Sequence, residues 1–146
     1  MSVLGVVAPV AGGVLAGVYL AFDLAVMPAL RRSRVPVGAP DDPAETMRAI
    51  NVAIVRPSFL ALLFGAPVLA VVAAVVEPTP WTVAAAVLQV GGLVVTMAVN
   101  VPLNDGLAAG GPWERFVGPW TRAHRVRTAA ALLAVLAGVV QASVWP

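Results

Sequence analysis

The chain alternates long apolar segments with short polar ones. Val3 to Leu30 carries one charged residue, Asp23, and residues 57–76, 81–103 and 128–146 carry none. Each segment has about 19 residues or more, which at a rise of about 1.5 Å per residue spans a hydrocarbon core of roughly 30 Å. The pattern therefore predicts four transmembrane helices, with spans of about 3–30, 57–76, 81–103 and 128–146.

Composition supports a membrane protein. Hydrophobic residues make up 60% of the chain and charged residues 11%, and the mean hydropathy is +0.94. A soluble domain of this length needs more polar residues to cover its surface. The short connections favour one domain, residues 1–146, built as an all-α antiparallel four-transmembrane-helix bundle.

Arginines are distributed unevenly along the chain. All nine basic residues are arginines. Those between the first and second spans are Arg31, Arg32, Arg34, Arg48 and Arg56; those between the third and fourth are Arg115, Arg122, Arg125 and Arg127. Basic loops stay on the cytoplasmic side. We therefore expect a multi-pass cell-membrane protein with cytoplasmic Arg-rich loops and both termini on the non-cytoplasmic side. The chain has no basic stripe interleaved with aromatic residues, so we expect no nucleic-acid partner.

The connecting segments carry helix breakers and start signals. Prolines at 36, 40 and 43 prevent a helix, and the helical pattern resumes at Ala44, where Asp42 or the preceding turn is expected to cap it. The second helix is thus predicted to begin before its span at Pro57, and Pro67 to kink it. Residues 106–111, with Pro112, are predicted to form a short flexible loop.

Gly13 and Gly17 form a small-xxx-small pair in the first span. Such a pair lets two helices approach closely. It predicts tight packing inside the protein, and it also permits a homo-oligomer without requiring one.

Each predicted span carries one polar stripe. By helical spacing the stripes are Tyr19 and Asp23 on the first span, Asn51 and Ser58 on the second, Gln89, Thr96, Asn100 and Asn104 on the third, and Trp120, His124 and either Arg127 or Thr128 on the fourth. Polar groups beside hydrocarbon are costly and often functional. We therefore expect the stripes to meet at the cytoplasmic end and form a site there.

Simpler interpretations exist for each residue. Asn100 and Asn104 can bridge helices without further function. Asp23 can pair with Arg56 or Arg127, and His124 can act as an interfacial hydrogen-bonding residue.

Tryptophans favour the membrane interface. Trp113 and Trp120 are accordingly expected at one interface and Trp81 and Trp145 at the other. With one histidine and no cysteine, the chain has too few suitable ligands for a zinc or copper site, so no metal ligand is assigned. The absence of cysteine also excludes disulfides and dithiol redox chemistry.

Several motifs together resemble a known family. They are Gly17-Val-Tyr-Leu-Ala-Phe22, Val26-Met-Pro-Ala-Leu30, Met47-Arg-Ala-Ile-Asn51, Asn100-Val-Pro-Leu-Asn104 and Trp120-Thr-Arg-Ala-His-Arg-Val-Arg127. In this order the chain is similar to the anthrone-oxygenase-like family of small four-helix membrane proteins. His124 stands where asparagine is common in the family.

The resemblance implies oxidation of a polycyclic phenolic, anthrone-type substrate by O2, usually in aromatic polyketide metabolism. The expected partners are thus a hydrophobic aromatic small molecule and the lipid bilayer. No cofactor is predicted beyond O2 as co-substrate, and a metal remains open. Within this hypothesis His124 or Asp23 is the catalytic base. The expected substrate-binding residues are Tyr19, Asn51, Asn100, Asn104, Trp120 and Arg127.

Two other functions remain as alternatives. A small-molecule binding or transport protein also fits four helices with an acidic residue in the first, although the one-sided arginines favour a single orientation. An accessory subunit that orients a partner enzyme at the membrane is the third interpretation.

Overall fold

The computed structural model describes residues 2–33, 35–36, 38–39 and 42–144. These residues form helices and connections, with no strand among them. Four helical segments are long and apolar enough to cross a membrane: Val3–Arg32, Pro57–Val76, Pro80–Ala108 and Trp113–Val144. The prediction of four helices long and apolar enough to span a membrane is confirmed.

The elements follow the chain in a simple order. They are α1 (Val3–Ala21), the π-helical turn η1 (Phe22–Val26), α2 (Met27–Arg32), α3 (Pro43–Ile54), α4 (Pro57–Val76), α5 (Pro80–Val95), the π-helical turn η2 (Thr96–Asn100), α6 (Val101–Ala108) and α7 (Trp113–Val144). The side chains of Ser2, Asp42 and Thr79 cap α1, α3 and α5 by accepting backbone N–H groups. The expected cap at Asp42 is confirmed.

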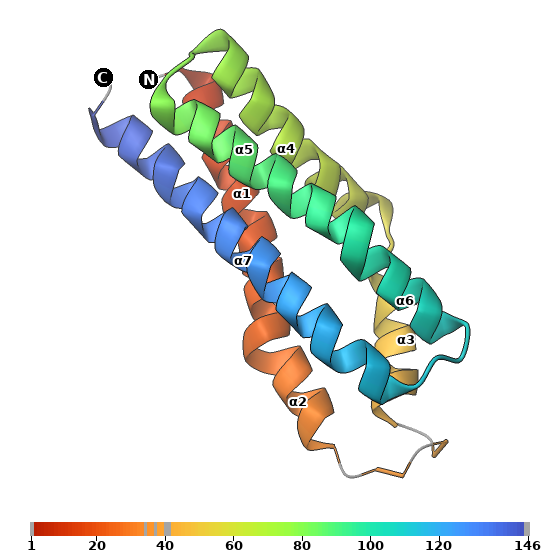
Figure 1. The fold of residues 1–146 in the computed structure, drawn as a ribbon. Helices are drawn as coiled ribbons and strands as arrows, with labels where there is room; N and C mark the ends of the chain where they lie inside the picture. Colours follow the sequence, from red (N-terminus) through yellow and green to blue (C-terminus); the bar gives the residue numbers. More distant parts are fainter. Residues whose placement is uncertain (1, 34, 37, 40–41, 145–146) are drawn as a thin grey trace.

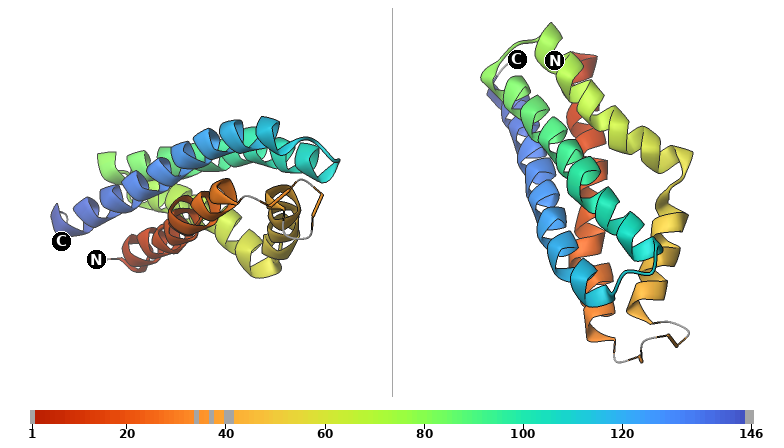
Figure 2. Two further views of the ribbon diagram at one scale, coloured as in Figure 1. Left: turned by 90° about the horizontal axis from the view of Figure 1, so that it is seen from below. Right: turned by 45° about the vertical axis from the view of Figure 1, so that its right-hand side comes forward.

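The four long helices pack side by side (Figure 1). Each of α1 and α5 contacts both α4 and α7, and α7 runs alongside α5 and α6 (Figure 2). Both chain ends lie at the end that carries the α4–α5 turn, here called the termini end. The opposite, arginine-rich end carries α2, α3 and residues 109–112. Arg34 and Trp145, used in the sequence predictions, lie outside the described residues.

The third and fourth membrane-length helices are longer than predicted. The helix expected to end near residue 103 continues to Ala108. The predicted loop, residues 106–111 with Pro112, is therefore limited to residues 109–112. The fourth begins at Trp113 instead of 128 and has 32 residues. Phe116, Trp120 and His124 recur every four residues and are all buried. Burying this face stabilises the extra turns as helix despite the surrounding charges.

The second helical region is divided in two. Arg56 has an extended backbone (φ −119°, ψ 154°) because the ring of Pro57 disfavours helical geometry in the residue before it. α3 therefore ends at Ile54 and α4 starts at Pro57. The Nε of Arg48 donates to the carbonyl of Leu107 at 2.9 Å and ties α3 to α6.

Close helix packing uses other glycines than predicted. A Cβ on Gly138 would lie 2.7 Å from Cβ of Pro9, and one on Gly12 would lie 2.5 Å from Nε2 of Gln89. A Cβ on Gly17 would meet nothing within 4 Å, and one on Gly13 would meet only one atom, at 3.9 Å. The prediction of tight internal packing at Gly13 and Gly17 is wrong, because the face that packs is one residue away.

Candidate functional site

A cavity of about 280 Å³ lies among α1, α3, α4, α7 and the η2–α6 segment. Its lining comes from all four membrane-spanning segments and from α3. The lining residues are Val18, Tyr19, Phe22, Asn51, Ile54, Val55, Phe59, Leu60, Leu63, Phe64, Thr96, Met97, Asn100, Val101, Asn104, Trp120 and Arg127. This volume is close to the lower end of ligand pockets in proteins. Here it is called the site cavity.

Two π-helical turns flank the site cavity. η1 spans Phe22–Val26 and η2 spans Thr96–Asn100, and each ends two residues before a proline, Pro28 or Pro102. A π turn inserts one extra residue and rotates the following side chains, and such turns concentrate at functional sites. Sequence reasoning did not identify them; a proline follows each one, but Pro9 and Pro67 lie inside α-helix without such a turn, so a proline alone does not mark it.

Arg127 carries the positive charge of the site cavity. Its side chain is buried, with 8% of the residue exposed. The guanidinium donates from Nη1 to Oγ1 of Thr96 at 3.2 Å and lies 4.5 Å above the ring of Tyr19. Its carbon is also 5.5 Å from the centre of the Trp120 ring. Aromatic faces and a hydroxyl thus hold a cation at the cavity wall.

His124 lies behind this cation and fixes it in place. Nδ1 of His124 accepts from Nε and Nη2 of Arg127 at 2.9 and 2.7 Å. Because arginine has only donors, the imidazole proton must be on Nε2, which donates to the carbonyl of Tyr19 at 2.9 Å. The ring also stacks on Trp120 at 4.7 Å with an angle of 12°. His124 is fully buried and does not line the site cavity.

Asp23 completes a row of ionisable groups with His124 and Arg127. Its Oδ2 accepts from Oγ1 of Thr128 at 2.7 Å and lies 3.7 Å from Nε2 of His124. Oδ1 is buried without a partner among the described residues. The alternative pairing of Asp23 with Arg56 or Arg127 does not occur as a direct ion pair within 4.0 Å; the contacts are with His124 and Thr128 instead. Asp23, like His124, is outside the cavity lining.

Three asparagines line the site cavity. Nδ2 of Asn100 donates to the carbonyl of Trp120 at 3.2 Å, and Oδ1 of Asn104 accepts from its indole Nε1 at 2.8 Å. Oδ1 of Asn100 and Nδ2 of Asn51 are buried without partners in the described part of the chain. Unpartnered buried polar atoms are rare in proteins. Both residues also line the site cavity.

The structure brings six of the eight predicted site residues to the cavity wall. They are Tyr19, Asn51, Asn100, Asn104, Trp120 and Arg127. Ser58, expected on the same stripe as Asn51, is exposed and outside the lining. Trp120 is 2% exposed and packs between Phe116 and His124, so its side chain is surrounded by protein, and its depth at the membrane interface stays a prediction. Trp81 is 41% exposed at the termini end.

The aromatic and sulfur-containing part of the lining was missed from the sequence. Phe22, Phe59, Phe64 and Met97 each line the cavity, yet within apolar spans nothing distinguishes them from lipid-facing residues.

Among the described residues no group of three histidine, aspartate or glutamate side chains is close enough to hold a metal ion.

The fold and the site define a class: a protein of four membrane-length helices with a buried arginine, amides and aromatic rings around a cavity between the helices. The chain belongs to the anthrone oxygenase family, whose family model matches residues 46–137. The matched stretch includes Asn51, Asn100, Asn104, the Trp120–Arg127 segment, most of α3 and all of α4 to α6; Tyr19 and Asp23 precede it. No curated protein and no solved structure is detectably similar to the chain. The family relation points to an oxygenase-type activity.

Proposed function

We propose that the protein is an integral membrane oxygenase that oxidises a polycyclic phenolic anthrone to the corresponding quinone with O2, in aromatic polyketide metabolism. The observation that carries the proposal is the buried guanidinium of Arg127 in the wall of an otherwise aromatic and amide-lined cavity. A fixed cation in a site with little water stabilises a negative charge that develops on a bound oxygen.

In the proposed reaction the substrate is first deprotonated to an anion, which then reacts with O2. Loss of a proton from the anthrone methylene gives an enolate whose charge lies on the ring system and its oxygen. The enolate carbon forms a bond to O2, and the resulting peroxide takes up a proton. Loss of one water then leaves the second carbonyl, so one anthrone and one O2 give one quinone and one water.

In the proposal Arg127 binds the enolate oxygen, and the cavity atoms Nδ2 of Asn51 and Oδ1 of Asn100 bind the other polar groups of the substrate. Tyr19 and Trp120 contact the planar rings. Asn104 holds the indole of Trp120 in position through the 2.8 Å hydrogen bond. A tricyclic substrate is largely apolar, which suits the remaining aromatic and aliphatic lining.

His124 and Asp23 are the proposed proton acceptors. Nδ1 of His124 faces Arg127, so it becomes free to accept the methylene proton once the guanidinium shifts towards the carbonyl oxygen of the bound anthrone. The imidazolium that forms is then next to the carboxylate of Asp23, 3.7 Å from Nε2. A carboxylate behind a histidine base stabilises the charged ring in this way in many enzymes.

The substrate is proposed to enter from the bilayer. Phe64 and Met97 line the cavity and are 43% and 48% exposed, so the cavity opens between α4 and η2 on the surface that faces lipid. In the same proposal the helices form an antiparallel bundle in the cell membrane. The arginine-rich end, nearer the cavity, is cytoplasmic, and both termini are on the other side.

The test is oxygen consumption and quinone formation by purified protein given an anthrone, with and without a chelator. We expect turnover, and a loss of about 10²-fold in His124→Ala and in Asp23→Asn, because a positioned base contributes about that much or more. Full turnover in both folded variants would remove these residues from the mechanism. Substrate-dependent proton flux in proteoliposomes without quinone would instead support the transport alternative.

A further inference from the structure

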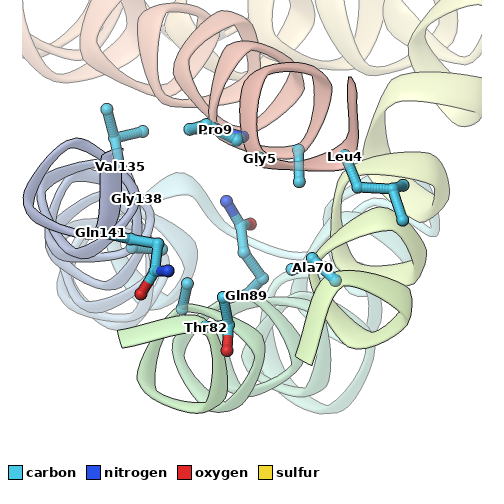
Figure 3. Close-up of a pocket in the computed structure, with 13 residues that line it drawn as sticks. Leu4, Gly5, Pro9, Ala70, Thr82, Gln89, Val135, Gly138 and Gln141 are labelled. Atoms are coloured by element: carbon cyan, nitrogen blue, oxygen red, sulfur yellow. The ribbon is translucent and has the colours of Figure 1, made fainter. Parts of the chain in front are cut away.

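A second cavity, of about 30 Å³, lies at the termini end. Figure 3 shows its lining residues between α1, α4, α5 and α7. Its lining residues are Leu4, Gly5, Ala8, Pro9, Ala70, Ala73, Thr82, Ala85, Gln89, Ala134, Val135, Gly138 and Gln141. None of them belongs to the site cavity, and no step of the proposed reaction uses them. We call it the upper cavity.

Gln89 projects into the middle of the upper cavity (Figure 3). The residue is 5% exposed, and its amide makes no hydrogen bond with any other described residue. The amide reaches α1 because Gly12 leaves room for it: a Cβ there would lie 2.5 Å from Nε2. A primary amide buried among alanines without a partner is strongly unfavourable. Something must therefore satisfy it.

Other polar groups face the same space. Gln141 is 7% exposed; its Oε1 accepts from Oγ1 of Thr79 at 2.6 Å, which leaves its amide N–H groups for other acceptors. Pro9 has no N–H to give to the carbonyl of Gly5 one turn earlier, and both residues line the cavity. A buried water needs about 10–15 Å³ and two to four polar partners. The upper cavity offers both.

The cavity ends at Gln89. Between Gln89 and Arg127 lies a void with essentially no room for a water molecule. Leu15, Leu63, Leu88 and Leu93 line this void together with Tyr19 and Ala131. This layer, here called the leucine layer, separates the upper cavity from the site cavity.

We infer that the upper cavity is a water-binding site in which one or two water molecules bind the Gln89 amide, and that the leucine layer stops water there. Water then satisfies the buried amides of α5 and α7 without reaching Arg127. The site cavity is thereby closed to water from the termini end.

The absence of cysteine in the chain makes the inference testable by single-cysteine variants of the full-length protein in detergent. Ala134 lines the upper cavity and Ala131 the leucine layer. Both are on α7, one turn apart, and both are 3% exposed. Ala134→Cys and Ala131→Cys are therefore a matched pair. The probe is Ag⁺, which is small and reacts with thiolates in water, and the readout is protection from later maleimide labelling in denaturant.

We expect Ala134→Cys to react with Ag⁺ about 10-fold or more faster than Ala131→Cys, because the thiolate forms where water is present. Ala73→Cys, which also lines the upper cavity, should behave like Ala134→Cys and replaces it if that variant does not fold. Ser143→Cys, at an exposed position of the same helix, is the positive control.

The role of Gln89 is tested by adding Gln89→Leu to Ala134→Cys. Removing the amide should make the cavity dry and slow the reaction with Ag⁺ about 10-fold. Equal rates for Ala134→Cys and Ala131→Cys would overturn the inference, and so would xenon bound in the unsubstituted upper cavity under pressure. An unchanged rate in Gln89→Leu would show that Gln89 does not hold the water.

Discussion

The two ends of the four-helix structure are built from different residues and enclose different spaces. At the termini end the upper cavity is lined by five alanines and two glycines and measures about 30 Å³. Near the arginine-rich end the site cavity is lined by five aromatic residues and three asparagines and measures about 280 Å³. The larger side chains accompany the larger cavity.

The comparison shows how a cavity can form inside a helical membrane protein. Small residues let helix backbones approach closely, as at Gly138 and Pro9. Near the other end Trp120 and Phe22 keep the helices apart, and the break before Pro57 moves α3 away from the axis of α4. The two π turns then direct side chains inward. The larger cavity therefore arises where packing is least regular.

Replacing Arg127 should have the largest effect on this difference. Arg127→Met removes the cation of the site cavity, and we expect turnover to fall about 10²–10³-fold, the usual loss when one oxyanion partner is removed. The control is Arg125→Met, an exposed position two residues away on α7, which should retain activity. The measurement is kcat for quinone formation. Equal activity of the two variants would show that Arg127 only supports the fold.

Alanine substitutions at two glycines compare a closely packed position with an open one. A Cβ on Gly138 would lie 2.7 Å from Pro9, whose ring cannot move aside, and Gly17 has open space. We expect Gly138→Ala to lower stability by about 1–3 kcal/mol through overpacking. Gly17→Ala should be neutral or raise stability by up to about 1 kcal/mol, since alanine favours helix. Thermal unfolding in detergent checks both; a Gly17→Ala loss as large as that of Gly138→Ala would place Gly17 in an interface between copies.

The smallest expected effect concerns pH. The backbone N–H groups of Glu45 and Gly38, each 2.7 Å from the carboxylate of Asp42, hold its pKa below the usual value. The folded state therefore gains stability from Asp42 above the ordinary pKa of about 3.9, and loses it as pH falls through the lowered pKa. Ser2 and Thr79 cap the helices at the termini end without titrating.

The measurement is the unfolding midpoint followed by tryptophan fluorescence between about pH 6 and pH 3. Asp42→Asn still caps a helix but does not titrate, so the variant should show a shallower decline with acid than the natural protein. The same decline in both proteins would mean that other carboxylates dominate.

Much of the fold could be predicted from the sequence because apolar length and helical spacing are local properties. The four spans, the cap at Asp42 and the stripes of α5 and α7 followed from them. The π turns and the length of α7 did not, since they depend on which faces are buried. Trp120 was predicted at the interface because an indole next to charged residues favours that depth, but packing against Phe116 and His124 buries it.

The site shows the same division. Residue types and spacing identified six residues that line the cavity. Spacing could not show that Arg127 faces the cavity while His124 and Asp23 lie behind it. His124 and Arg127 share one side of α7, and Asp23 is on a different helical segment whose position relative to α7 only the fold gives. Nor could residue types and spacing distinguish Phe59 or Phe64 from residues in contact with lipid, since both environments are apolar.

By itself the sequence determined four membrane-length helices and which helical faces are polar, because these depend on residue type and a fixed helical period. The tertiary structure decided where those faces meet. It set the order of Asp23, His124 and Arg127 along hydrogen bonds, left Asn51 and Asn100 with unpartnered atoms, and separated two cavities by a layer of leucines. Such features depend on distances between helices, which packing fixes and no local pattern encodes.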